Sequence, residues 1–184
     1  MATVAEKLLT AEEYAQMPDP GYPTELVRGK VVETGSTGFQ HGKIASTIGR
    51  LIGNFADDHD LGHVVTNGSG VITGRTPDSV RGPDIAYYGY ASIPKGPLTT
   101  GYPSVPPDLI FEVLSPSDRW PLFLNKVSEY LSAGVVVVCV VDPRTSTIYL
   151  YRVEAPLEVV GAKDEWSVPD ILPNLTIPVR QFFE

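Results

Sequence analysis

Cysteine, long apolar runs and basic residues are all scarce in this chain of 184 residues. Cys139 is the one cysteine, which excludes an intrachain disulfide, and no Cys-x-x-Cys pair or His/Cys cluster indicates a structural zinc site. No apolar run approaches the roughly 18 residues of a transmembrane helix, and the first twenty residues lack an apolar stretch of signal-peptide length. We therefore expect a protein without a membrane segment that works in the reducing cytoplasm.

Positive charge is also in short supply. Lysine and arginine number 14 against 22 acidic residues, which gives a net charge of −8. Nucleic-acid binders usually have the opposite balance, so the charge argues against wide contact with phosphates. The hydrophobic share of 42% is typical of a folded chain. The sequence shows no linker and no internal repeat, and its length fits one domain over 1–184.

The first half of the chain alternates short β-prone runs with helical patterns. His41 heads the buried stripe of one predicted helix, so its side chain should point inward. The predicted elements are a helix over 11–17 begun by a capping box, a hairpin over 25–33, a helix over 39–56, strands at 63–73 and 80–88, and an irregular connection over 89–107.

The second half contains a strand-helix-strand pattern. The runs at 108–115 and 135–142 are almost continuously apolar, and helical spacing lies between them over 119–133. Parallel strands joined by a helix have both faces covered, and the crossover is right-handed in almost all proteins. With antiparallel strands expected at 147–153 and 158–168, the predicted fold class is α/β, a mixed sheet flanked by helices.

Two acidic residues stand in these predicted strands. Glu112 is the one polar residue between Leu109 and Leu114, where both faces of the strand should be covered. A buried carboxylate has to be protonated, paired with a cation or bound to a metal, so a structural ion pair and a metal site both stay open. Asp84 follows Gly82-Pro83, and strand alternation points it inward, although Gly-Pro-Asp is also typical of an exposed turn.

Lys126 is the cation that counting brings to the level of Glu112. Glu112 lies three residues, about 10 Å, before the end of its strand, and Lys126 lies about 12 Å along the returning helix. Lys126 borders the apolar stripe of that helix. Its side chain either extends along the core edge to water or reaches over the sheet towards the two acids.

Asp84, Glu112 and Lys126 together would form a site of hard oxygen ligands beside a cation. Two carboxylates on adjacent strands suit Mg²⁺, or Mn²⁺, which keeps several waters. The metal would polarise a phosphate oxygen and lower the pKa of a bound water, while the lysine orients that water or offsets charge at phosphorus. We expect Asp84 and Glu112 as metal ligands and Lys126 as the third catalytic residue in phosphodiester hydrolysis.

At these residues the sequence resembles a known group of proteins. Pro83-Asp84, a later Glu112 on a buried strand and a lysine on the next helix are similar to the PD-(D/E)-x-K nuclease superfamily, which has the restriction-endonuclease-like fold. More narrowly, ELVRGKVVE, RGPDIAYY, PDLIFEVLSPSDR and EYLSAGVVVVCVVDP resemble the bacterial Uma-type family of endonucleases over nearly the whole chain. In the simple motif the lysine stands two residues after the glutamate, where this chain has Leu114, so Lys126 is the candidate for its role.

The same resemblance implies two further residues and a substrate. An acid near the chain start and a nearby histidine line such sites, and the matching positions are Glu25 and His41. A capping or core-edge role fits these two residues equally well. The expected substrate is nucleic acid, with DNA first. The apolar outer strands are compatible with a homodimer, but exposed sheet edges also occur in monomers. The competing hypothesis is a non-catalytic protein-interaction module of the same fold, in which the acids and the lysine form a salt-bridged core; the acidic balance favours it.

Overall fold

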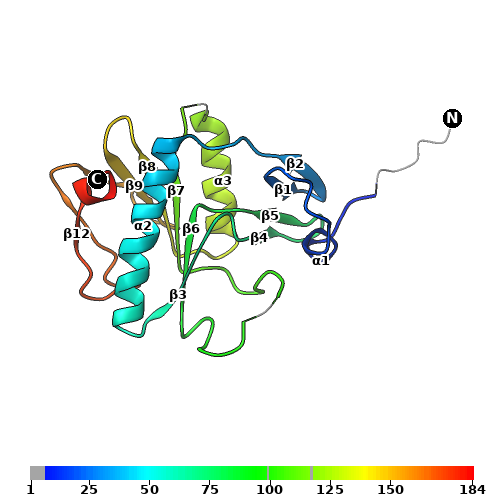
Figure 1. The fold of residues 1–184 in the computed structure, drawn as a ribbon, viewed down its shortest axis with the longest axis horizontal. Coiled ribbons are helices and arrows are strands. Elements are labelled where there is room, and N and C mark those ends of the chain that lie inside the picture. Colours follow the sequence, from blue (N-terminus) through cyan, green and yellow to red (C-terminus); the bar gives the residue numbers. More distant parts are fainter. Residues whose placement is uncertain (1–6, 99, 117) are drawn as a thin grey trace.

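The computed structural model describes residues 7–98, 100–116 and 118–184. Most of the elements are strands, and two long helices lie among them (Figure 1). In chain order they are α1 (Ala11–Ala15), β1 (Thr24–Val27), β2 (Lys30–Glu33), α2 (Phe39–Asp58), β3 (Gly62–Thr66), β4 (Val71–Gly74), β5 (Ser79–Arg81), β6 (Ile85–Gly89), β7 (Leu109–Val113), α3 (Trp120–Ser132), β8 (Val137–Asp142), β9 (Thr147–Tyr151), β10 (Glu158–Gly161), β11 (Glu165–Trp166), β12 (Ile177–Pro178) and the 3-10 helix η1 (Val179–Phe182).

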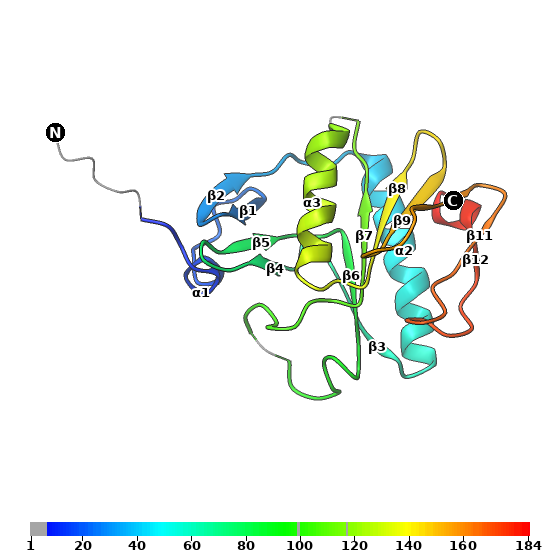
Figure 2. The same ribbon diagram turned by 180° about the vertical axis from the view of Figure 1, so that it is seen from behind.

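A six-stranded mixed sheet forms the centre of the fold, in the order β10-β9-β8-β7-β6-β3. β7 and β8 are parallel and joined by α3, while the other neighbours are antiparallel. α2 covers one face of this sheet and α3 covers the other, as the two opposite views show (Figure 1 and Figure 2). The predicted mixed sheet flanked by helices is therefore confirmed, and β7 is buried on both sides.

A second, antiparallel sheet in the order β2-β1-β5-β4 contains the hairpin predicted over 25–33. The prediction of one strand over 80–88 is wrong, because β5 belongs to this small sheet and β6 to the large one. Pro83 lacks the backbone N–H that the hydrogen-bond ladder of a sheet needs, so strand pairing stops between β5 and β6. The turn at Asn67-Gly68 crosses between the same two sheets, and a Cβ on Gly82 would lie 2.9 Å from the carbonyl oxygen of Gly68. Asp84 thus stands where the two sheets meet.

Side chains from the two helices fill separate cores on the two faces of the large sheet. On the α2 face, Ile48 and Ile52 pack with Phe111, whose ring centroid lies 5.3 Å from that of Trp166. On the α3 face, Val127 and Tyr130 pack against the alternate residues of β6, β7 and β8. Both cores hold β7 in place, which fixes the position of any side chain that it carries.

The prediction of one strand over 158–168 is wrong, because β10 pairs with β9 in the large sheet and β11 pairs with β12 in a separate two-stranded sheet. The helix predicted over 11–17 ends at Ala15, and its predicted capping box of Thr10 and Glu13 is present. β3 and β10 are the edges of the large sheet, and Val159 on β10 is half exposed. The homodimer stays a prediction, in which two copies of the chain would meet at exposed sheet edges such as these. None of the described helices is long and apolar enough to cross a membrane.

Candidate active site

Five side chains from five separate segments line one cavity of about 510 Å³ at the end of β7. The starts of α2 and α3 come together there, beside the connection from β2 to α2 (Figure 1). These five side chains belong to the five candidate site residues that were singled out in the sequence. They are Glu25 of β1, His41 of α2, Asp84 before β6, Glu112 of β7 and Lys126 of α3.

Glu112 is the most deeply buried acid of this cavity, at 5% exposure. Its Oε1 accepts a hydrogen bond of 2.7 Å from the hydroxyl of Tyr130 and lies 2.8 Å from Nζ of Lys126. Burial raises the pKa of Glu112 to about 7, because the attraction of Lys126 does not fully offset it and Asp84 adds repulsion. A carboxylate in this position gains from any further positive charge in the cavity.

The side chain of Lys126 reaches over the sheet towards the acids, which is the second of the two arrangements predicted from the sequence. Nζ lies 2.8 Å from Glu112, 3.1 Å from Glu25 and 3.4 Å from the carbonyl oxygen of Gly82. An ammonium group has three N–H donors, so these three acceptors account for all of them. Burial disfavours the charged lysine, but the carboxylates of Glu112 and Glu25 outweigh burial and raise the pKa of Lys126. Lys126 therefore stays protonated at neutral pH.

Glu25 connects Lys126 to an ion-pair network that the sequence did not reveal. Its Oε2 lies 2.8 Å from Arg81, and its Oε1 accepts a 3.0 Å hydrogen bond from the N–H of Gly82. Arg81 also binds Glu129 of α3 through two nitrogens, at 2.7 and 2.8 Å. Burial of Glu25 acts against its charge, but Lys126, the Gly82 N–H and Arg81 together lower its pKa. The network fastens α3 to the small sheet.

Asp84 lies immediately before β6 rather than within a strand. Ile85 faces Phe111 in the antiparallel register, so the next step brings Asp84 beside Glu112. Oδ2 of Asp84 accepts the N–H of Val113 at 2.7 Å and lies 3.1 Å from Nε2 of His41. The side chain thus takes over the hydrogen bond that a continued ladder would have made. Burial lowers the pKa of His41, but the hydrogen bond and charge of Asp84 raise it overall.

Comparison with known proteins now bears on this arrangement. The model of the Uma2 family, described as "Putative restriction endonuclease", matches residues 11–180. The chain belongs to the Uma2 family. A crystal structure described as a "putative nuclease" from Anabaena variabilis superposes with a TM-score of 0.82 at 21% identity, covering 95% of this chain and 97% of that one. No curated protein matches the chain. The family and the restriction-endonuclease-like fold predicted from the sequence are confirmed.

Tyr130, Arg81 and Gly82 are the residues of this Uma2 site that the sequence did not single out. Tyr130 stands in the apolar stripe of α3, where its ring is indistinguishable from a core residue until its hydroxyl partner is known. Among the described residues, no group of three or more His, Cys, Asp or Glu side chains is arranged to hold a metal. The acidic pair of Asp84 and Glu112 remains, and two carboxylates with waters are the usual protein share of a Mg²⁺ shell.

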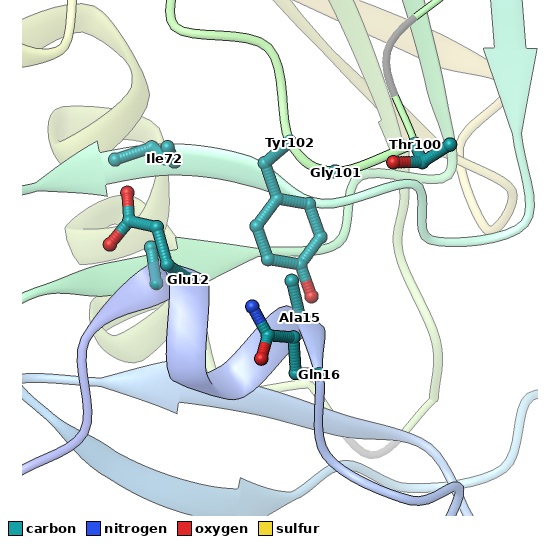
Figure 3. A pocket seen from close by; sticks show the side chains of 8 residues that line it. Glu12, Ala15, Gln16, Ile72, Thr100, Gly101 and Tyr102 are labelled. Atoms are coloured by element: carbon teal, nitrogen blue, oxygen red, sulfur yellow. The ribbon is translucent and has the colours of Figure 1, made fainter.

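A second cavity, of about 340 Å³, lies beside α1 and provides a comparison with the active-site cavity. Figure 3 shows the ring of Tyr102 reaching towards Ala15 at the end of α1 and Gln16 just after it, with Glu12 on the same helix. Glu12 is an exposed acid that pairs with Arg75 at 2.9 Å. This cavity brings no buried acids together, in contrast with the end of β7.

Proposed function

We propose that this protein is a metal-dependent endonuclease that hydrolyses phosphodiester bonds of nucleic acid. The observation that carries the proposal is the meeting of Asp84, Glu112 and Lys126 on one cavity, with the lysine on a helix, Glu112 on β7 and Asp84 beside it just before β6. DNA is the polymer to test first, because the Uma2 family is described as one of restriction endonucleases.

The donors of this cavity fit Mg²⁺ or Mn²⁺. Glu112 and Asp84 each engage one oxygen in the protein, Oε1 and Oδ2, so the hydrogen bonds fix both carboxylates without using the other oxygen. The repulsion between the two acids is a further reason for a cation to bind between them. A bound metal would polarise a phosphate oxygen and lower the pKa of a water.

The chain's own residues orient the ligands and supply charge. Tyr130 and Lys126 hold Glu112, while the Val113 N–H and His41 hold Asp84, which makes His41 a positioning residue. The three N–H groups of Lys126 are occupied, so its contribution is a fixed positive charge that offsets charge developing at phosphorus.

One observation favours the competing function, a non-catalytic protein-interaction module. The cations Lys126 and Arg81 are fully paired with Glu25, Glu112 and Glu129, which is also what a purely structural ion-pair core requires. Under that hypothesis the cavity has no need of a metal.

Calorimetric titration with Mn²⁺ and cleavage of supercoiled plasmid with Mg²⁺ separate the two functions. We expect the wild type to bind the metal and nick the plasmid, and Asp84→Asn to lose both activities while its thermal unfolding stays close to wild type. Asp142→Asn is the control, because Asp142 is a buried and ion-paired acid at the end of β8 that does not line the cavity. Absence of metal binding and of cleavage in the wild type would favour the interaction module.

A further inference from the structure

A further hollow continues from the candidate active site along α2, beside Thr66 and Asn67 at the end of β3. It has a volume of about 530 Å³ and is here named the α2 groove. Four residues line both the groove and the active-site cavity, so the two are continuous. The shared residues are Thr37, His41, Asn67 and Asp84.

The floor of the α2 groove lies close to the helix backbone. Between His41 and Arg50, its residues on α2 are Gly42, Ala45, Ser46 and Gly49, none of which has a large side chain. A Cβ at Gly42 would meet nothing within 4 Å, and its φ lies outside the left-handed region, so neither packing nor backbone geometry requires glycine there. An extended molecule could therefore approach the helix closely at Gly42, whereas Thr66 fills the space beside Gly49, where a Cβ would lie 3.1 Å from Cγ2 of Thr66.

A buried polar atom stands where the groove joins the active site. His41 is 7% exposed and lines both hollows. Nε2 of His41 binds Asp84, but its Nδ1 has no hydrogen-bond partner among the described residues. Buried polar atoms are nearly always satisfied, so an unpartnered one at this junction points to a group supplied from outside the chain.

Arg50 provides positive charge at the other end of the groove. It is exposed and makes no ion pair or hydrogen bond with any residue that the structure describes. Lys43 on the same helix differs, because its Nζ already binds Thr47 and the carbonyl oxygen of Glu184. Arg50 stands nine positions after His41, which is about 14 Å along the helix and about four nucleotides at the rise of a stacked strand.

An exposed aromatic residue stands at the start of α2, one turn before Gly42 of the groove floor, although it is not among the residues that line the groove. Phe39 is 92% exposed, more than any other large hydrophobic residue described. It precedes Gly42 by three positions and so lies on the same face of α2 as the groove floor. Aromatic rings beside a strand path are stacking surfaces for unpaired bases, and such stacking does not depend on charge.

We propose that the α2 groove binds a single strand of nucleic acid that leads to the active site, with Phe39 stacking on an unpaired base and Arg50 contacting a phosphate. This inference rests on the proposed nuclease function and narrows its substrate to strands that are unpaired next to the cleaved bond. A duplex would be a poorer ligand, since duplex binding relies on many neutralised phosphates and the chain has a net charge of −8.

Equilibrium binding tests the groove without relying on catalysis. Fluorescence anisotropy would measure the full-length protein against a labelled 12-nucleotide single strand and a hairpin duplex of the same sequence, in buffer with a chelator so that no cleavage occurs. Phe39→Ala should weaken single-strand binding roughly 5- to 150-fold, and Phe39→Trp should restore it. Arg50→Ala should weaken binding and reduce the slope of log affinity against log salt by about 0.7.

Two exposed residues away from the groove serve as controls. Leu157→Ala matches the loss of an exposed apolar side chain, and Lys163→Ala matches the loss of an exposed cation. Both should bind as the wild type does. Equal or tighter binding of the duplex overturns the inference, and so does an effect of the Phe39 and Arg50 variants no larger than that of these controls.

The outcomes also distinguish a failure of this inference from a failure of the proposed nuclease function. Plasmid cleavage that needs Asp84, combined with unchanged binding in both groove variants, would overturn the groove and leave the nuclease standing. Single-strand binding that needs Phe39 and Arg50, without cleavage, would support strand binding in the α2 groove and contradict the proposed hydrolysis. A wild type that neither binds nor cleaves any nucleic acid overturns both.

Discussion

The two faces of β7 are equally buried and chemically opposite. Towards α2 the strand presents Leu109, Phe111 and Val113, all apolar and at most 2% exposed. Towards α3 it presents Ile110 and then Glu112, which is 5% exposed and hydrogen-bonded rather than packed against apolar atoms. One face contributes to stability by excluding water, whereas the other gives up part of that contribution to hold a charge beside a cavity. The contrast predicts that mutations on the two faces separate stability from activity.

Glu112→Gln should give the largest effect, and on activity alone. A metal is worth several kcal/mol of transition-state stabilisation, so losing a charged ligand should reduce cleavage by at least about 10³-fold. Stability should be unchanged or higher, since a buried charge is removed and Lys126 keeps Glu25 and Gly82 as acceptors. Plasmid cleavage and thermal denaturation measure the two. A variant that unfolds instead would mean that Glu112 belongs to the structural core.

Phe111→Ala should produce the converse result on the opposite face. Deleting a fully buried phenyl ring leaves a cavity beside Trp166 and costs roughly 3–5 kcal/mol in the free energy of unfolding. Because the ring points away from the active-site cavity, activity per folded molecule should stay near the wild-type value. Urea denaturation followed by cleavage assays below the unfolding range checks both statements. Lost activity in fully folded protein would show that the two faces are coupled.

The pH dependence of stability should also distinguish the faces in metal-free protein. The pKa of Glu112 is about 7 in the folded chain and near 4.5 when the chain is unfolded. The raised value favours folding fully below pH 4.5, and this contribution is lost as the pH rises through 7, so the protein should be less stable at pH 8 than at pH 5. We expect a difference on the order of 2 kcal/mol that disappears in Glu112→Gln. Identical pH profiles for the two proteins would contradict the raised pKa.

Sequence patterns were informative wherever one strand or helix decides the outcome. Burial of Glu112 follows from the apolar runs around it, and the level of Lys126 follows from residue rises along one strand and one helix. The network of Arg81 and Glu129 could not be predicted in this way, because it depends on how the small sheet packs against α3. The exchange of sheets at Gly82-Pro83 was missed for the same reason, since β5 and β6 are continuous in sequence and differ only in their partners.

Tyr130→Phe should give the smallest effect and tests the α3 face most finely. The change removes one hydroxyl from a ring that is fully buried and leaves the packing of that ring intact. Glu112 then keeps Lys126 at the same oxygen but loses its neutral donor, so we expect about a tenfold decrease in cleavage and about 1 kcal/mol in stability. The pKa of Glu112 should rise further, which moves the pH midpoint of the stability profile upwards.

Tyr88→Phe is the matched control for that measurement, because Tyr88 is buried on the same face of the large sheet and its hydroxyl does not bind Glu112. An equal response of the two variants would assign the effect to the loss of a tyrosine hydroxyl on this face in general. A shift of the pH midpoint in Tyr130→Phe alone would mean that Tyr130 acts on the charge of Glu112. The α3 face would then differ from the α2 face by an acid whose ionisation the fold itself controls, and not only by carrying that acid.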